Sequence, residues 1–224
     1  MTTENDFQPP AKEYKYPEIE EQFMEVQEPP LIYVTQRYTY ADYLTWADDK
    51  MREIIDGFVY FFSAPLRRHA KAVSSFIIKS GSYIHKRKGK CEIYTAPFDV
   101  RLPMNGEIAD DKIYNVVQPD ICVVCDPAKL DDRGCIGAPD LIAEVVSPST
   151  SKRDMNEKFF LYEKVGVSEY WIIHPENKEV TVFILQSDGK YNAGTTYKLG
   201  QGTNKIPVKT LEGLMIDLKE LFAE

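Results

Sequence analysis

Residues 141–146 are apolar except for a single carboxylate, Glu144. The segment lies between Pro139-Asp140 and Ser147-Pro148, and a short apolar run bounded by such residues is typical of a buried strand. A carboxylate inside a buried strand is costly unless it is paired, hydrogen-bonded or bound to a metal. The segment therefore predicts a central strand that carries one acid with a partner still to be found.

A second carboxylate, Asp120, directly follows Pro119 at the start of another apolar run, residues 120–125. We expect Asp120 and Glu144 to lie on adjacent strands of one sheet. Two carboxylates in that arrangement form an oxygen-lined pocket suited to Mg²⁺ or Mn²⁺. Such an ion lowers the pKa of a bound water and neutralises charge that develops on a phosphate.

A lysine on the following helix completes the candidate set. A helix is expected over residues 152–165, where Asp154, Lys158 and Tyr162 are four residues apart and share one face. A lysine that reaches the pocket could orient the attacking water or stabilise charge on the phosphate. The alternative is a surface lysine paired with Asp154, which the spacing by itself favours. Lys158→Ala is expected to leave folding intact.

The order of the expected elements predicts an α/β fold, or more loosely an α+β fold with a mixed sheet and helices on its faces. Asp56-Gly57 between apolar runs predicts an N-terminal β-hairpin, and the turn at residues 187–190 predicts a C-terminal one. The other expected elements are helices at residues 39–46, 67–88, with Gly89 ending it, and 218–222, and strands at 91–96, 98–102, 120–125, 141–146, 169–173, 180–185 and 191–197.

Charge is distributed unevenly along the chain. Residues 1–30 hold −6 of the net charge of −8 and contain five prolines, so we expect a mobile acidic tail ahead of one domain, residues 31–224. Residues 67–90 form a basic stretch. We expect a solvated helix face there, with a phosphate-facing helix as the alternative.

The cysteine pattern and hydropathy bear on the compartment. Cys122 and Cys125 lie three apart in one strand, which suits neither a zinc knuckle nor a redox loop, so the four cysteines are interpreted as reduced core residues. No apolar run approaches the ~20 residues of a membrane-spanning helix. The N-terminus lacks the basic and apolar parts of a secretory signal. We expect a cytoplasmic protein with no membrane partner.

Several segments in series resemble the Uma-two family of the restriction-endonuclease-like PD-(D/E)xK superfamily. The resemblance extends over about residues 40 to 221 and leaves out the acidic tail. The matching positions are Glu53, Ile55-Asp56-Gly57, Ser63-Ala64-Pro65, His69, residues 117–121 and 138–150, Asp154, Lys158, Tyr162, Gly166-Val167 and residues 169–173.

This resemblance implies Asp120 and Glu144 as metal ligands in a restriction-endonuclease-like core. Val146 stands where the superfamily's E-x-K lysine would be, and the resemblance implies that Lys158 has taken over that role. We predict that the backbone carbonyl of Val145 is a third ligand.

Three further residues are expected to support these candidate site residues. The resemblance adds Glu53 as a further carboxylate, His69 as a nearby polar group, and Tyr162 beside Lys158. For His69 the alternative is a partly buried histidine satisfied by the backbone.

The leading hypothesis is an Mg²⁺-dependent endonuclease that cleaves DNA with a metal-activated water. The alternative is a catalytically silent module for nucleic-acid binding or protein interaction, which the acidic balance favours. A third, weaker hypothesis is a hydrolase of small phosphate compounds. DNA is the expected partner, and a homodimer is compatible with the sequence.

Overall fold

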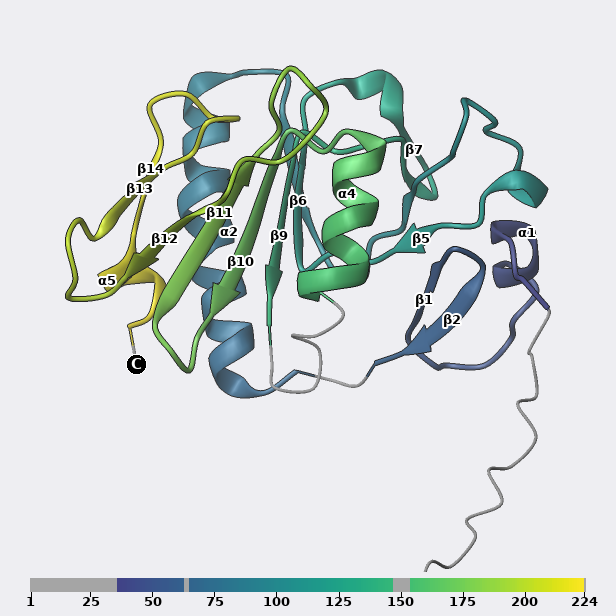
Figure 1. Ribbon diagram of the computed structural model, residues 1–224, viewed down its shortest axis with the longest axis horizontal. Helices are drawn as coiled ribbons and strands as arrows, with labels where there is room; N and C mark the ends of the chain where they lie inside the picture. Colours follow the sequence, from purple (N-terminus) through teal and green to yellow (C-terminus); the bar gives the residue numbers. More distant parts are fainter. Residues whose placement is uncertain (1–35, 63–64, 147–153, 224) are drawn as a thin grey trace, which may run out of the picture. The chain divides into compact units, whose positions relative to one another are not determined.

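A mixed six-stranded sheet forms the centre of the fold, as predicted (Figure 1). The structure, a computed structural model, describes residues 36–62, 65–146 and 154–223, which all belong to the compact unit Thr35–Glu224. The strand order of this central sheet is β12-β11-β10-β9-β6-β3, and its central pair β9–β10 is parallel. The strands are β3 (Glu92–Thr95), β6 (Ile121–Val124), β9 (Leu141–Val145), β10 (Glu169–His174), β11 (Glu179–Ile184) and β12 (Thr195–Lys198).

A second six-stranded sheet, which the sequence did not predict, contains the N-terminal hairpin. Its strand order is β2-β1-β5-β4-β8-β7. The predicted hairpin is confirmed: Asp56 and Gly57 join β1 and β2 with φ of 49° and 82°, the positive values that a tight hairpin turn requires. The strands are β1 (Arg52–Ile55), β2 (Phe58–Phe61), β4 (Val100–Arg101), β5 (Val116–Val117), β7 (Leu130–Asp131) and β8 (Gly134–Ile136).

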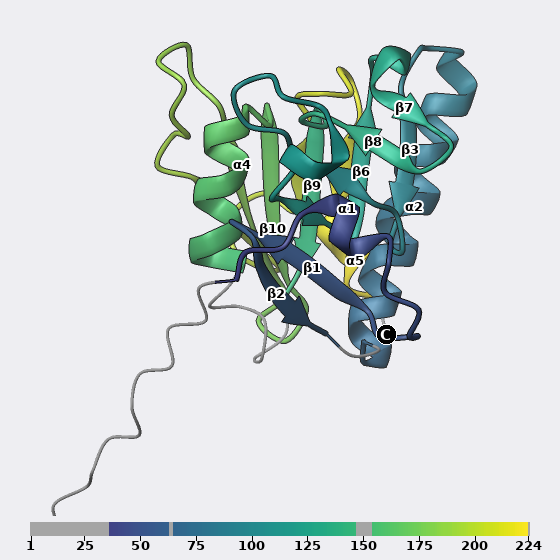
Figure 2. The same ribbon diagram turned by 90° about the vertical axis from the view of Figure 1, so that its right-hand side faces the viewer.

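Helices cover both faces of the central sheet (Figures 1 and 2). The long helix α2 packs with α5 on one face, and α4 lies on the other. The helices are α1 (Tyr40–Tyr43), α2 (Arg67–Arg87), α4 (Phe159–Val165) and α5 (Leu218–Leu221), with single turns η1 (Asp110–Lys112), η2 (Pro127–Lys129) and the π-helical turn η3 (Asp154–Lys158).

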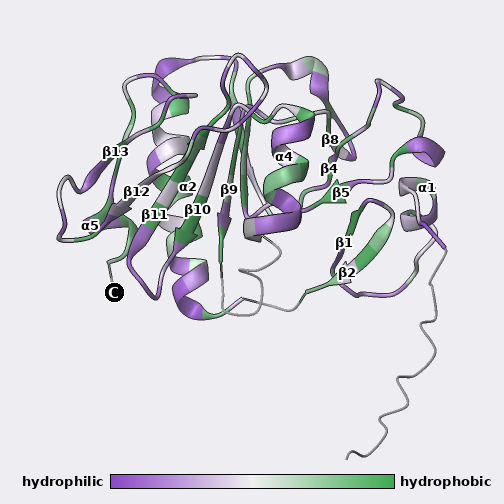
Figure 3. Cartoon of the chain, viewed as in Figure 1, coloured by the Kyte–Doolittle hydropathy of each residue, from purple (hydrophilic) through white to green (hydrophobic). Residues whose placement is uncertain are grey.

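Alternation along the central strands divides the core in two. On β9, Ala143 and Val145 pack toward α2 while Ile142 packs toward α4 and the second sheet. Because both faces are covered, β10 and β11 are predominantly hydrophobic along their length, whereas α4 shows both hydrophobic and hydrophilic colours (Figure 3). Glu144 lies on the α4 side of this division, at the C-terminal end of β9.

The helix boundaries differ from the prediction in informative ways. Thr39 and Asp42 form the expected capping box, but α1 ends at Tyr43. Lys88, rather than Gly89, takes the left-handed conformation that ends α2. The predicted helix 152–165 begins, in its described part, with the π-helical turn η3, which ends at Lys158, and Gly166 ends α4 as expected. Single π-turns inside helices are frequent at functional sites.

The sequence missed the shortest elements. Strands β5, β7 and β8 have two or three residues each, too few to show a periodicity. The same holds for the two-stranded sheet of β13 (Lys205–Pro207) and β14 (Met215–Asp217). The predicted acidic tail and residues 63–64 and 147–153 lie outside the described residues. Along the part of the chain that is described, no helix has the length and apolar character needed to cross a membrane.

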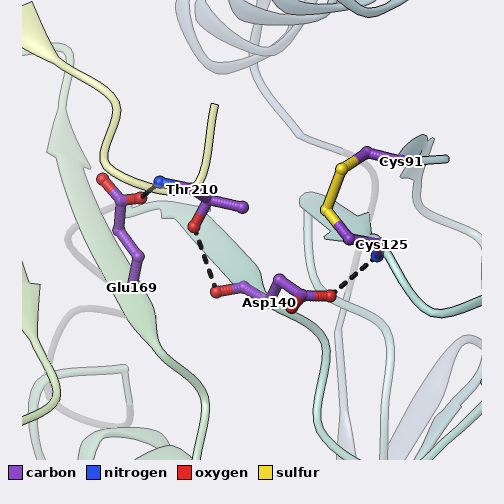
Figure 4. The surroundings of a disulfide bond; sticks show 5 residues. All are labelled: Cys91, Cys125, Asp140, Glu169 and Thr210. Carbon is purple, nitrogen blue, oxygen red and sulfur yellow. Dashed lines mark hydrogen bonds between the residues drawn. A yellow bond between two sulfur atoms is a disulfide. The ribbon is translucent and has the colours of Figure 1, made fainter. Parts of the chain in front are cut away.

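The expectation of four reduced cysteines is wrong for two of them. Cys91 and Cys125 form a disulfide bond that joins the segment before β3 to the end of β6 (Figure 4). The pair is 34 residues apart and becomes adjacent because β3 and β6 are antiparallel neighbours. Cys122 and Cys135 are free and buried, as expected, and burial raises the pKa of the Cys135 thiol to about 11.

Candidate active site

The pairing of β6 with β9 brings Asp120 and Glu144 together. In this antiparallel pair Ile121 lies opposite Ala143, so the residues just beyond them are neighbours. The main-chain N–H of Val145 donates to Oδ2 of Asp120 at 2.8 Å, and that of Asp120 lies 3.5 Å from Oε2 of Glu144. The two carboxylates therefore occupy one end of an adjacent strand pair, as predicted from the sequence.

Lys158 is buried and bridges two carboxylates. Its side chain lies between Glu144 and Glu53, with Nζ 2.9 Å from Oε1 of Glu144 and 2.8 Å from Oε1 of Glu53. Lys158 is only 4% exposed, so the alternative of a surface lysine is wrong. The side chain of Asp154, the proposed surface partner, lies outside the described residues. A buried lysine in this position requires its carboxylate partners, because an uncompensated buried charge is strongly unfavourable.

Glu53 comes from the second sheet. It is a buried residue of β1, and its Oε1 also accepts a hydrogen bond from the main-chain N–H of Gln118 at 2.9 Å. Gln118 immediately precedes Pro119-Asp120 in the chain. One lysine thus joins the hairpin of the second sheet to β9 of the central sheet, and the site lies where the two sheets meet.

Tyr162 holds Glu144 from α4. Its hydroxyl donates to Oε1 of Glu144 at 2.8 Å, and the side chain is fully buried one helical turn after Lys158. Burial, followed by the negative charges of Glu144 and Glu53, raises the pKa of the Tyr162 phenol well above its ordinary value. Tyr162 therefore remains a neutral donor at any physiological pH.

His69 approaches from the opposite face of the sheet. It lies in the first turn of α2, and its Nε2 is 3.0 Å from Oδ2 of Asp120. The described partner of His69 is thus a carboxylate, and the backbone-satisfied histidine considered from the sequence is not what the structure contains. Among the described residues, every hydrogen bond of the Asp120 side chain is formed by Oδ2.

A supporting network behind Gln118 was not foreseen. Its side-chain Nε2 donates to Oδ1 of Asp99 at 2.8 Å and to the Tyr43 hydroxyl at 3.1 Å. Tyr43 also donates to the same carboxylate. The network fixes the segment that carries both Gln118 and Asp120. No sequence signal marks Asp99, which falls in a predicted strand and lies just before β4 in the structure, whereas Gln118 adjoins the Pro-Asp pair.

The donor set suits a divalent cation that is completed by other ligands. The net charge of the site is −2 when His69 is neutral. It comes from the three carboxylates of Asp120, Glu144 and Glu53 and the ammonium of Lys158. Within the described residues no three His, Cys, Asp or Glu side chains are arranged to hold an ion by themselves. Mg²⁺ is ordinarily held by one or two carboxylates with waters and substrate phosphates. Asp120 and Glu144 fit that requirement; the Val145 carbonyl stays a prediction.

Comparison with known proteins identifies the family. The family model Uma2, described as "Putative restriction endonuclease", matches residues 40–219, most of the chain. The chain belongs to the Uma2 family. The matched region contains all seven residues assigned to the site from the sequence, namely Glu53, His69, Asp120, Glu144, Val145, Lys158 and Tyr162.

Two known proteins are similar to this Uma2 protein, one in sequence and one in structure. The Synechocystis sp. protein slr1290 is 27% identical over 153 residues, which are 67% of this chain and 75% of the relative. A crystal structure described as "a putative nuclease belonging to DUF820", from Anabaena variabilis, has a TM-score of 0.65 at 19% identity, covering 83% of this chain and 97% of that chain. This likeness supports the restriction-endonuclease-like fold, and family and fold together support a nuclease function.

Proposed function

We propose that this Uma2 protein is a metal-dependent endonuclease that hydrolyses phosphodiester bonds of DNA. The observation that carries the proposal is the buried Lys158 ammonium, which bridges Glu53 and Glu144, the latter a neighbour of Asp120 on the adjacent strand. The sequence predicts a lysine in this role only by resemblance, and in the folded chain Lys158 contacts Glu144, one of the two predicted metal ligands, together with Glu53.

Each carboxylate is oriented by a separate group. His69 and the Val145 amide hold Asp120, Tyr162 holds Glu144, and the Gln118 amide holds Glu53. Carboxylates fixed in this way need little reorganisation when they bind a ligand, which is the usual basis of electrostatic catalysis.

Asp120 and Glu144 are the residues that would hold the cation, Mg²⁺ or Mn²⁺. A divalent ion supplies Lewis-acid stabilisation of phosphoryl charge and a more acidic bound water. Lys158 contributes a positive charge that stays with the site, directed at charge developing on the attacked phosphate or at the attacking water. Tyr162, as a neutral donor, keeps Oε1 of Glu144 in place throughout.

The test is cleavage of supercoiled plasmid and of single-stranded DNA by the purified chain. We expect nicking or linearisation with Mg²⁺ or Mn²⁺ and none with EDTA. Glu169→Gln is a matched control, because Glu169 is a buried strand acid remote from these contacts. Absence of cleavage by the wild-type chain under all these conditions would contradict the proposal and favour the alternative of a silent nuclease-fold module.

A further inference from the structure

The first turn of α2 has a charge pattern opposite to the one that stabilises a helix. Its first residues are Arg67, Arg68 and His69, with no acidic residue, and the preceding Leu66 provides no side-chain cap. The N-terminal end of a helix carries partial positive charge and unpaired N–H groups, so cations there are unfavourable and anions favourable. Stability alone does not explain arginines at this position.

The same end of α2 faces a recess that is lined with further basic side chains. Arg67, Arg68 and Lys71 line it from the helix, and Lys178 lines it from the turn between β10 and β11. This turn lies beside the lower end of α2 in Figure 1. We call these four residues the α2 basic surface.

Charge compensation of the α2 basic surface is incomplete. Arg68 pairs with Glu176 at 2.6 Å, and both side chains are more than half exposed. Arg67 and Lys71 are exposed and form no ion pair with any residue in the described ranges. Two exposed cations thus remain available at a position where the helix already attracts anions.

The α2 basic surface adjoins the candidate active site. His69 belongs to the same helical turn as Arg67 and Arg68, and it contacts the Asp120 carboxylate. Because successive helix residues are turned by about 100°, Arg67 and Lys71 lie on a different side of α2 from His69, and a strand that passes around the N-terminal end of the helix would reach both sides. Arg67 and Lys71 are four residues apart, roughly 6 Å along the helix axis.

We propose that the α2 basic surface binds backbone phosphates of DNA and directs the strand toward Asp120 and Glu144. This inference rests on the proposed function. A nucleic-acid strand presents phosphates repeatedly along its length and can engage separated cations, whereas a small phosphate compound would engage fewer of them. The unfavourable helix electrostatics of Arg67 and Arg68 are relieved when phosphate oxygens approach this end of α2.

The test compares two double variants of the full chain. Arg67→Gln/Lys71→Gln removes the two uncompensated cations, and Lys86→Gln/Lys90→Gln removes two exposed lysines at the far end of the same helix region. Binding of a fluorescein-labelled DNA duplex, and of its single strand, is measured by anisotropy in EDTA over a series of NaCl concentrations. EDTA suppresses metal-dependent cleavage, so binding is read separately.

We expect Arg67→Gln/Lys71→Gln to raise the Kd about tenfold at low salt and to reduce the slope of log K against log salt by about 2. The control pair should change neither value appreciably. Thermal unfolding provides an independent check, because removing cations from the first turns of α2 should leave the Tm unchanged or raised. A folded variant that binds less well is thereby distinguished from a damaged one.

Equal Kd values and equal salt slopes for Arg67→Gln/Lys71→Gln and wild type would overturn the inference, as would absence of wild-type binding to either DNA. The outcome is separable from the proposed function. Binding that depends on Arg67 and Lys71 without cleavage in Mg²⁺ would retain the surface and reject the enzyme. Cleavage with unchanged binding would retain the enzyme and reject the surface.

Discussion

Glu144 and Glu169 are buried carboxylates on neighbouring central strands, and their partners differ in kind. Glu169, at the start of β10, is fully buried and accepts hydrogen bonds from the indole of Trp171 at 2.8 Å and from the main-chain N–H groups of Lys209 and Thr210 at 3.1 and 2.6 Å. Glu144, at the end of β9, is bound instead by the Lys158 ammonium and the Tyr162 hydroxyl.

Glu169 accepts hydrogen bonds only from uncharged donors among these partners, which indicates a structural role. Figure 4 shows the same end of the sheet, where Thr210 lies between Glu169 and Asp140, and Asp140 accepts from the main-chain N–H of Cys125 at 2.7 Å. Main-chain donors cannot leave without unfolding a segment. Among the described residues, the two shortest hydrogen bonds of Glu144 come from side chains, and one of these, Lys158, is a cation shared with Glu53, while the Asp120 main-chain N–H lies farther away at 3.5 Å. A buried acid with exchangeable, charged partners can bind a ligand, whereas one saturated by framework donors serves the fold.

The largest contrast is expected in cleavage rate when each acid is changed to its amide. Glu144→Gln should lower the rate by roughly 10³-fold, because it removes a candidate metal ligand and a positioned charge. Glu169→Gln should leave the rate nearly unchanged but reduce the free energy of unfolding by about 2 kcal/mol, since hydrogen bonds to a charged group are weakened. Initial rates and urea unfolding measure both. Similar losses of cleavage rate in the two variants would contradict the assignment of a ligand-binding role to Glu144 and a structural role to Glu169.

A smaller effect is expected for Lys158→Met, which keeps the length of the side chain and removes its charge. Cleavage should fall about 100-fold. The expectation that Lys158→Ala leaves folding intact is inconsistent with burial, because Glu53 and Glu144 would lose their shared cation at a cost of about 3–5 kcal/mol. Adding Glu53→Gln should restore much of the stability but not the activity. Restored activity in the double variant would show that Lys158 acts only on folding.

The third contrast concerns metal affinity at the two ends of the sheet. Asp120→Asn should weaken Mg²⁺ binding by at least about tenfold, an effect of the size seen when the surroundings of a metal are disturbed. Asp140→Asn should leave the affinity unchanged, since Asp140 bonds to the Cys125 amide. Calorimetric titration with a non-cleavable DNA analogue present supplies both values. Equal affinity for Asp120→Asn and wild type would contradict the ligand assignment.

The smallest effect is expected for Tyr162→Phe. Loss of the hydrogen bond to Glu144 should reduce the free energy of unfolding at neutral pH by about 1–2 kcal/mol. The folded-state pKa of Tyr162 is raised, so the stability it contributes is complete below its ordinary pKa of about 10 and is lost as the pH rises further. The difference in the free energy of unfolding between wild type and Tyr162→Phe should therefore become smaller above about pH 10. Urea unfolding at neutral and alkaline pH measures this difference. A difference that stays constant with pH would show that Tyr162 ionises normally.

Local sequence pattern determined much of the central framework. The apolar run around Glu144 predicted β9, Asp56-Gly57 predicted the first hairpin, and Gly166 predicted the end of α4. Each of these rests on residues within a few positions of one another, because strand and helix periodicities and turn conformations are local properties. The sequence also showed that Glu144 needs a partner, since the cost of burying a carboxylate does not depend on which partner satisfies it.

Only the tertiary structure decided which partners those are. Lys158 contacts Glu53, which is 105 residues away, and Cys91 bonds to Cys125 across 34 residues. Helical spacing alone favoured an exposed Lys158, and strand spacing alone favoured unpaired cysteines. Contacts between elements reversed the first expectation, and reversed the second for Cys91 and Cys125. Such contacts depend on the order of strands in the sheets and on where the helices pack, and they are stabilised by burial and charge pairing. A local sequence pattern does not show which distant side chain will supply the opposite charge.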